Sequence, residues 1–283
     1  MKRILIPTDF SQNSLSALDY VIENISNGAF EIILMWVDTT QTKDRLILDS
    51  ENLSIEKAVK AQFEKILKDY APKLGDGTLE YRIREGKVHV EVANQAKYDD
   101  VDLVVCCTHG ASGFEEHYIG SNAYRIVMYC ECPVITISPN YSSDSKPNIF
   151  VLPLDNSAEG VQKVPCTCKL AEITDAEIHI LGLYTSKLSS HRRKVDNYVS
   201  KVEYYIADAD IEFSTIFKET DNITKTILAY AESVNATLVS IMTEQESSAW
   251  NFLLGTHAER LLGASPIPVL TVTSKPITTS VIL

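Results

Sequence analysis

The sequence has little that suits a membrane or a nucleic acid. Its 283 residues contain no apolar run of the roughly 18 residues that a membrane-spanning helix needs, so we expect no membrane partner. Lysine and arginine together number 26, against 38 aspartate and glutamate residues. Nucleic-acid phosphates are bound through clustered basic side chains, so a net charge of −12 argues against a nucleic-acid partner. The first residues carry no signal-peptide cleavage pattern, and we expect a cytoplasmic protein.

The cysteines do not form a metal-ligand pattern. Cys106 and Cys107 are adjacent in an apolar run of strand length, so their side chains should point to opposite faces of a sheet. His109 lies nearby in the sequence, but no second Cys/His pair stands at ligand spacing. All six cysteines lie in or beside apolar strand and helix patterns, where free thiols act as small hydrophobes: Cys106, Cys107, Cys130, Cys132, Cys166 and Cys168. We therefore expect reduced thiols and no metal site.

What the chain does contain is the same pattern twice. Residues 4–11 read Ile-Leu-Ile-Pro-Thr-Asp-Phe-Ser, and residues 150–157 read Phe-Val-Leu-Pro-Leu-Asp-Asn-Ser. Later, Gly120-Ser121 and a Cys-Pro-Val-Ile-Thr run return as Gly255-Thr256 and an Ile-Pro-Val-Leu-Thr run. A tandem duplication is the simplest cause. A stretch of linker composition separates the copies, so we place the first domain at 1–140 and the second at 148–275.

Strand and helix patterns alternate in both halves. Apolar runs predict strands at 3–7, 31–37, 79–84, 103–107, 134–137, 148–152, 177–183, 211–217, 238–242 and 269–272. Helical spacing predicts helices at 11–25, 53–74 and 88–96, one after Gly120, and four in the second half centred on Val161, Tyr198, Leu228 and Arg260. Pro165 should kink the first of these four. The alternation predicts α/β architecture: two tandem, doubly wound, five-stranded parallel-sheet domains.

The loop after strand 103–107 has features of a phosphate-binding loop. It contains Gly110 and Gly113 and leads to Gly120-Ser121 at the head of a helix. Glycine lets the backbone approach a ligand closely, and a helix start offers unpaired amides in a positive field. Asp9 ends the first strand and should lie on the neighbouring rim, as an acceptor for an adenine amine or a ribose hydroxyl. Two plainer roles stay open: Asp9 as support for the turn, and Gly120-Ser121 as a simple helix cap.

The order of these motifs resembles the universal stress protein family in tandem form. Strand-Pro-x-Asp-x-Ser, Asp-Leu-Val-Val before His-Gly, nine residues to Gly-Ser and a closing Cys-Pro-Val-Ile-Thr-Ile carry the resemblance. It implies a Rossmann-like fold whose halves are related by a pseudo-twofold axis. It also implies ATP binding, with Asp9 and Val37 at the adenosine and glycine-rich amides at the phosphates. The expected nucleotide-binding residues are Thr8, Asp9, Val37, Cys107, Gly110, Gly120, Ser121 and Asn122.

Both halves depart from the family's glycine pattern. Cys107 stands where ATP-binding members have the first glycine; a Cβ there would cost about 1 kcal/mol if the position needs a positive φ or a bare wall against phosphate. In the second half, Met242 and Gln245 replace two glycines, and Thr256 and Glu259 form a capping box that puts a carboxylate at the helix start. The sequence therefore predicts one nucleotide site and one degenerate site.

Our leading hypothesis is a stress-response regulator that binds ATP or another adenine nucleotide, with or without magnesium, in its first half. Occupancy would change its association state or its binding to an unknown protein partner. No nucleophile, base and oxyanion arrangement emerges, so we expect at most slow ATP hydrolysis. The alternatives are a nucleotide-free interaction or scaffold protein and a hydrolase or ligase acting on the nucleotide α–β bond. The resemblance further implies that strands 134–137 and 269–272 pair antiparallel, as in a family homodimer, and two chains could associate further.

Overall fold

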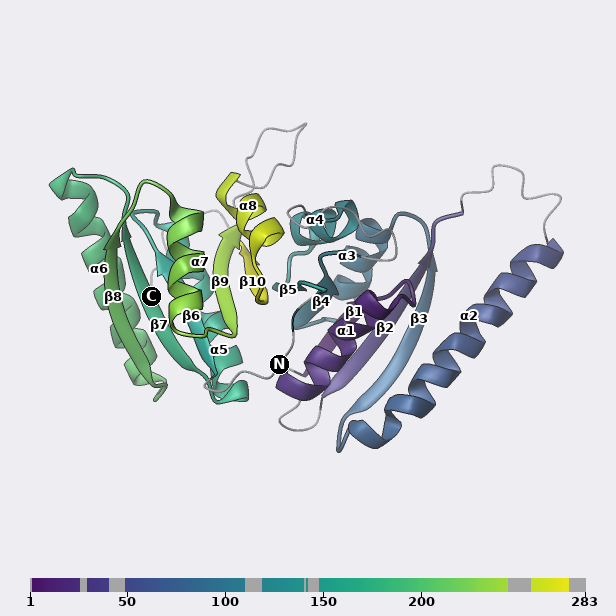
Figure 1. Cartoon of the computed structure of the whole chain (residues 1–283). Coiled ribbons are helices and arrows are strands. Elements are labelled where there is room, and N and C mark those ends of the chain that lie inside the picture. The colour runs from purple at the N-terminus through teal and green to yellow at the C-terminus, as the bar shows by residue number, and fades with distance from the viewer. Residues whose placement is uncertain are drawn as a thin grey trace.

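A computed structural model describes residues 2–25, 30–40, 49–109, 119–139, 141, 148–243 and 256–274. One ten-stranded sheet runs through both halves in the order β3-β2-β1-β4-β5-β10-β9-β6-β7-β8 (Figure 1). Its strands are β1 (Arg3–Pro7), β2 (Glu31–Asp38), β3 (Thr78–Glu85), β4 (Leu103–Cys107), β5 (Val134–Ile137), β6 (Ile149–Leu154), β7 (Glu177–Tyr184), β8 (Phe213–Glu219), β9 (Leu238–Thr243) and β10 (Val269–Thr273).

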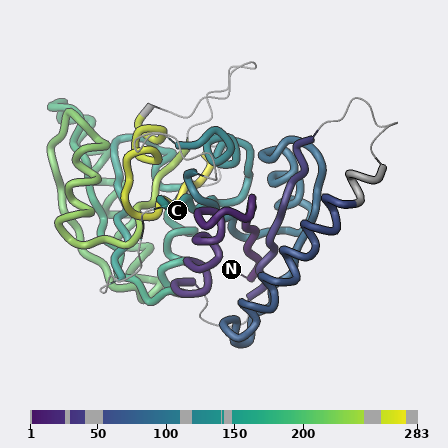
Figure 2. The backbone as a smooth tube through the Cα atoms, turned by 45° about the vertical axis from the view of Figure 1, so that its right-hand side comes forward, coloured from purple at the N-terminus to yellow at the C-terminus, as the bar shows by residue number. Residues whose placement is uncertain are grey.

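Eight α-helices cover the sheet in the described part of the chain. They are α1 (Gln12–Tyr20), α2 (Asp49–Tyr70), α3 (Val88–Tyr98), α4 (Ser121–Tyr129), α5 (Val164–Thr174), α6 (Ser189–Asp208), α7 (Ile223–Ser233) and α8 (Thr256–Ala264). Three short helical segments adjoin them: the π-helix η1 (Val21–Ile25) and the 3₁₀ helices η2 (Ala71–Lys73) and η3 (Glu159–Lys163). Figures 1 and 2 show the two halves lying side by side. No helix of the described residues is long and apolar enough to cross a membrane.

The strands bury both of their faces, and this explains their almost continuous apolar sequences. Ile4 and Ile6 of β1 point into a layer formed with α1, α2, α5 and α6, whereas Leu5 points into a layer with α3, α4, α7 and α8. Successive side chains of a strand alternate between faces, so each strand feeds both layers. The predicted doubly wound α/β fold is confirmed, and both core layers continue from the first half into the second.

The two halves join through their closing strands. β5 pairs antiparallel with β10, with Ile135 opposite Leu270, whereas every other strand pair is parallel. The Thr271 hydroxyl donates a hydrogen bond to the Val134 carbonyl at 2.9 Å, which adds to the backbone ladder. The antiparallel junction expected from the sequence is therefore confirmed. Only β3 and β8 remain as edges of the described sheet.

A serine cap marks the start of the first helix in the first half, and a proline marks the start of α5 in the second half. Ser11 is the N-cap of α1, and its hydroxyl accepts from the Ser14 amide at 3.2 Å, as its position in the sequence predicts. The expected kink at Pro165 is wrong. The segment before it forms η3, and α5 begins at Val164, which places Pro165 in the first turn. A proline there removes no intrahelical donor and its fixed φ suits a helix start.

Candidate functional site at the first sheet switch point

A cavity of about 460 Å³ opens at the carboxyl ends of β1, β2 and β4. Sheet order reverses between β1 and β4, because the chain moves outward from β1 to β2 and β3 and then returns to β4 on the other side. Such a switch point leaves a crevice between diverging loops. The walls come from the segments that follow these three strands and from the first residues of α4. The volume falls in the range of about 300–1,000 Å³ that is typical of small-molecule sites.

The predicted nucleotide-binding residues converge on this cavity. Seven of the eight line it: Thr8, Asp9, Val37, Cys107, Gly120, Ser121 and Asn122. The eighth, Gly110, lies outside the described residues. The sequence placed these residues on three different segments, and the parallel pairing of β1 with β2 and β4 brings those segments together.

Asp9 holds the turn between β1 and α1. Its Oδ1 accepts from the Ser11 amide at 3.0 Å and from the Ser11 hydroxyl at 2.5 Å. Thr8 supports the same turn: its hydroxyl accepts from the Phe10 amide at 3.0 Å and lies 2.9 Å from the Ser14 hydroxyl. Phe10 adopts a left-handed φ of 64°, which these hydrogen bonds help to hold. The structural role considered for Asp9 is thus present, and the same exposed side chain lines the cavity.

The backbone at Cys107 does not have the positive φ that would make a Cβ costly there. The described non-glycine residues with positive φ do not include Cys107, so this strand end does not require glycine on backbone grounds. The thiol donates to the Asn13 carbonyl of α1 at 2.5 Å and lies 3.1 Å from the Ser16 hydroxyl. Burial raises the pKa of the Cys107 thiol to about 11, so it stays protonated near neutral pH. The thiol is therefore held by α1.

Gly120 is required by a close backbone approach. A Cβ at this position would lie 2.6 Å from the Thr108 carbonyl oxygen, which real Cβ atoms do not tolerate. The Gly120 amide donates to that same oxygen at 2.8 Å. Gly120 is also the N-cap of α4, it supplies no capping side chain, and the first turn of α4 holds no acidic residue. The positive end of the α4 dipole therefore faces the cavity rim without a carboxylate of its own helix.

Further residues of the cavity were not among those predicted. Asp38 ends β2 as Asp9 follows β1, and its Oδ1 accepts from the Thr40 amide at 2.8 Å. Asp38 could have been identified from the sequence, because it is an acidic residue at the end of a second strand. His109 also lines the cavity, with Nδ1 at 3.0 Å from the Thr108 hydroxyl. The described lining contains two carboxylates, Asp9 and Asp38, and no lysine or arginine.

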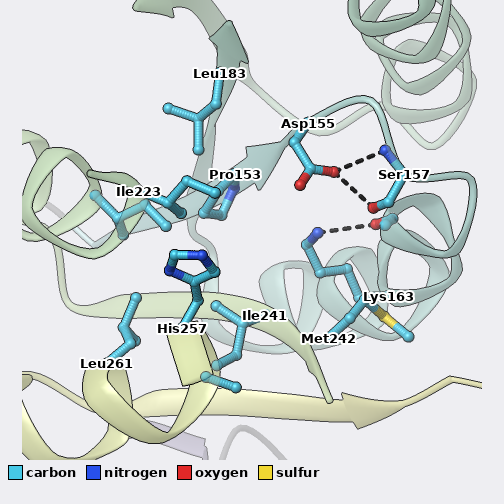
Figure 3. A pocket seen from close by; sticks show the side chains of 13 residues that line it. Pro153, Asp155, Ser157, Lys163, Leu183, Ile223, Ile241, Met242, His257 and Leu261 are labelled. Atoms are coloured by element: carbon cyan, nitrogen blue, oxygen red, sulfur yellow. Dashed lines mark hydrogen bonds between the residues drawn. The ribbon is translucent and has the colours of Figure 1, made fainter. Parts of the chain in front are cut away.

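The equivalent place in the second half holds a smaller cavity of about 150 Å³ (Figure 3). Asp155 repeats the Asp9 turn there: its Oδ1 accepts from the Ser157 amide at 2.9 Å and from the Ser157 hydroxyl at 2.6 Å. Met242 lines this cavity. Gln245 and Gly255 lie outside the described residues, as does the Thr256 side chain, so the expected capping box with Glu259 stays a prediction.

The comparison with known protein families agrees with this duplicated architecture. The model of the universal stress protein family matches residues 1–138 and matches again over residues 150–273. The chain belongs to the universal stress protein family. Its two matches in series make it a tandem member, as the motifs in the sequence indicated.

Individual universal stress proteins resemble the chain over one half or over nearly all of it. The universal stress protein MJ0577 of Methanocaldococcus jannaschii is 27% identical over 155 residues, which cover 48% of this chain and 94% of that protein. The universal stress protein MJ0531 of the same organism is 26% identical over 138 residues, covering 48% and 81%. The crystal structure of a universal stress protein from Archaeoglobus fulgidus superposes with a TM-score of 0.76 at 22% identity, covering 96% of this chain and 98% of that one. That last likeness supports the fold alone.

Proposed function

We propose that the first half of this tandem universal stress protein binds an adenine nucleotide, ATP, and that occupancy alters the association state of the protein or its binding to a protein partner in a stress response. The main support is the convergence of Thr8, Asp9, Val37, Gly120 and Ser121 on one cavity of about 460 Å³. At the equivalent place in the second half, the described residues line a cavity of about 150 Å³.

The adenosine end of the site lies beside β1 and β2. Met35 and Val37 are buried at the end of β2 and give an apolar surface for a base. Asp9 and Asp38 stand at the ends of the neighbouring strands, where carboxylates can accept from a base amine or from ribose hydroxyls. This combination of apolar wall and acceptors suits a nucleoside.

The phosphate end lies at the start of α4. The amides of Ser121 and Asn122 stand at the positive end of the helix, and Gly120 lets this end approach Thr108 closely. With Asp9 and Asp38 nearby, a triphosphate needs its charge reduced, so we expect ATP to bind with magnesium. The described residues contain no group of three or more His, Cys, Asp or Glu side chains that could hold a metal ion. The magnesium ligands would therefore come mainly from phosphate oxygens and water.

Calorimetry of the full chain with ATP, AMP and adenosine, each with and without magnesium, tests the proposal. The matched variants are Asp9→Asn and Asp155→Asn, because the two aspartates hold the same turn in the two halves. We expect Asp9→Asn to weaken ATP binding at least tenfold and Asp155→Asn to leave it unchanged. Sedimentation velocity with and without ATP then tests the change in association. Equal effects of the two substitutions on ATP affinity would contradict a site in the first half.

The nucleotide-free scaffold is the second candidate, and one observation favours it. Two carboxylates line the described cavity without a basic side chain, and Oδ1 of Asp9 is already used by the turn. If the scaffold hypothesis is correct, no adenine compound gives heat or a thermal shift at millimolar concentration.

We also propose that the two duplicated domains span residues 1–140 and 148–275.

A further inference from the structure

The cavity of the second half is a different kind of site, with opposite charges at one end and, at the other, aliphatic side chains beside the His257 imidazole. In Figure 3, Asp155, Ser157 and Lys163 lie at one end, and Leu183, Ile223 and Leu261 lie at the other. Lys163 was not among the functional residues predicted from the sequence. Its side chain is 3% exposed, which is rare for a lysine without a carboxylate in contact.

The Lys163 ammonium is incompletely paired. It donates one hydrogen bond, to the Gly160 carbonyl at 2.8 Å, although an ammonium has three donors. Asp155 is the nearest opposite charge, but no ion pair within 4.0 Å joins the two residues in the described structure. Lys163 Nζ and Asp155 Oδ1 each lie 3.9 Å from the point where a Cβ of Gly160 would be. The Ser157 hydroxyl lies nearer, at 3.2 Å, so Lys163, Asp155 and Ser157 surround this point in front of Gly160.

The internal repeat shows that this arrangement is particular to the second half. Asp155 corresponds to Asp9 with an offset of 146 residues, and the same offset matches Gly160 with Ser14 and Lys163 with Ala17. Ala17 is fully buried in the first half. The second half therefore has a lysine where the first half has a methyl group.

The size and charge of the cavity select the ligand class. About 150 Å³ is one third of the volume of the first cavity and suits a compact ligand with a short tail, because an apolar cavity of that size in another protein holds benzene. A simple carboxylate would face Asp155, and a simple amine would face Lys163. A zwitterion places each of its charges beside the opposite charge and leaves the site neutral.

We propose that the cavity between η3, α7 and α8 binds a free aliphatic α-amino acid of about the size of leucine. The carboxylate of the amino acid pairs with Lys163 and its ammonium pairs with Asp155. The aliphatic tail lies against Leu183, Ile223 and Leu261. His257, on the first turn of α8, is the other titratable side chain of the lining. This site is separate from the nucleotide cavity, and it does not depend on nucleotide binding.

Calorimetry and ligand-observed NMR of the full chain with four probes test the ligand class. Leucine carries both charges and the tail, 4-methylpentanoate lacks the amine, 3-methylbutylamine lacks the carboxylate, and glycine lacks the tail. We expect leucine to bind with a Kd of about 1 mM or tighter and each of the other three to bind at least tenfold more weakly. Equal or tighter binding of 4-methylpentanoate or 3-methylbutylamine would overturn the zwitterion assignment, and absence of leucine binding at 10 mM would overturn the site.

Substitutions in and outside the cavity test where leucine binds. Lys163→Met removes the cation and Ile223→Trp fills the apolar end at a half-buried position, and each should weaken leucine binding at least tenfold. Lys169→Met removes an exposed lysine of α5 and should leave leucine affinity within twofold. Saturating ATP should also leave it within twofold, so competition by ATP would overturn a separate site. Should Lys163→Met fail to fold, the four-probe series on the unmodified chain and Ile223→Trp still decide the proposal.

Discussion

Replacement of Gly120 by alanine tests the backbone approach on which the first cavity depends. The added Cβ would lie 2.6 Å from the Thr108 carbonyl oxygen, so the two segments must separate by at least several tenths of an ångström. Forced overpacking of this kind costs about 1–3 kcal/mol. The 2.8 Å hydrogen bond from the Gly120 amide to the same oxygen would lengthen, which adds up to about 1 kcal/mol. We expect a total loss of about 2 kcal/mol in the free energy of unfolding.

Thermal unfolding and ATP calorimetry together measure this effect. A loss of about 2 kcal/mol should lower the melting temperature by roughly 4–8 °C in a chain of this size. ATP affinity should fall at least tenfold, because the start of α4 moves away from Thr108. For the melting temperature, Ser121→Ala is the matched control: it changes the adjacent residue on the same helix start, where no side-chain capping bond is present. A Gly120→Ala protein that melts within 1 °C of the unmodified chain would refute the steric argument.

Three further predictions concern the two cavities and the junction between halves. Burial lowers the pKa of Lys163 from 10.5 to about 8, so the unfolded chain binds more protons between these values and stability rises with pH through that window. The free energy of unfolding of Lys163→Met at pH 7 should therefore exceed that of the unmodified chain by about 3 kcal/mol. Urea unfolding should show that this difference shrinks from pH 8 to 10.5, whereas Lys169→Met should show no such trend. Cys107→Gly should change ATP affinity in calorimetry by less than twofold, because the thiol is bonded to α1; a tenfold gain would show that the Cβ obstructs phosphate. A fragment of residues 1–140 exposes β5, which β10 covers in the full chain, so light scattering should find it dimeric or aggregated; a stable monomer would contradict the importance of the junction.

Much of the fold could be predicted because buried parallel strands have a strong sequence pattern. The limits of β4 and β5 match the sequence prediction to the residue. β6 extends beyond its predicted end through Pro153, which pairs in register with Leu181 although proline cannot donate to the ladder. The helical segment before Pro165 was misjudged because periodicity does not separate a 3₁₀ turn from the first turn of an α-helix.

The candidate site was predictable where backbone geometry determines it and unpredictable where side-chain direction does. Asp9 was found because it follows a strand at the switch point, and Gly120 because it stands at the head of a helix. The family resemblance indicated that Cys107 stands at a glycine position, but it could not show that the thiol points to α1. Lys163 was missed because a lysine in a helical pattern normally reaches solvent, and only its burial in three dimensions reveals its role.

The two halves share one turn and differ in what the following helix places behind it. In each half an aspartate after the first strand binds the amide and hydroxyl of a serine two residues later, so the local backbone is set in the same way. Behind the first turn lies the methyl group of Ala17, and the cavity opens to about 460 Å³. Behind the second turn lies the Lys163 ammonium, and the cavity is about 150 Å³. A site that had only degenerated would gain by replacing this buried cation with an apolar side chain, because burial without a close counter-charge is unfavourable. The proposed zwitterionic ligand would supply the counter-charge that this buried lysine lacks.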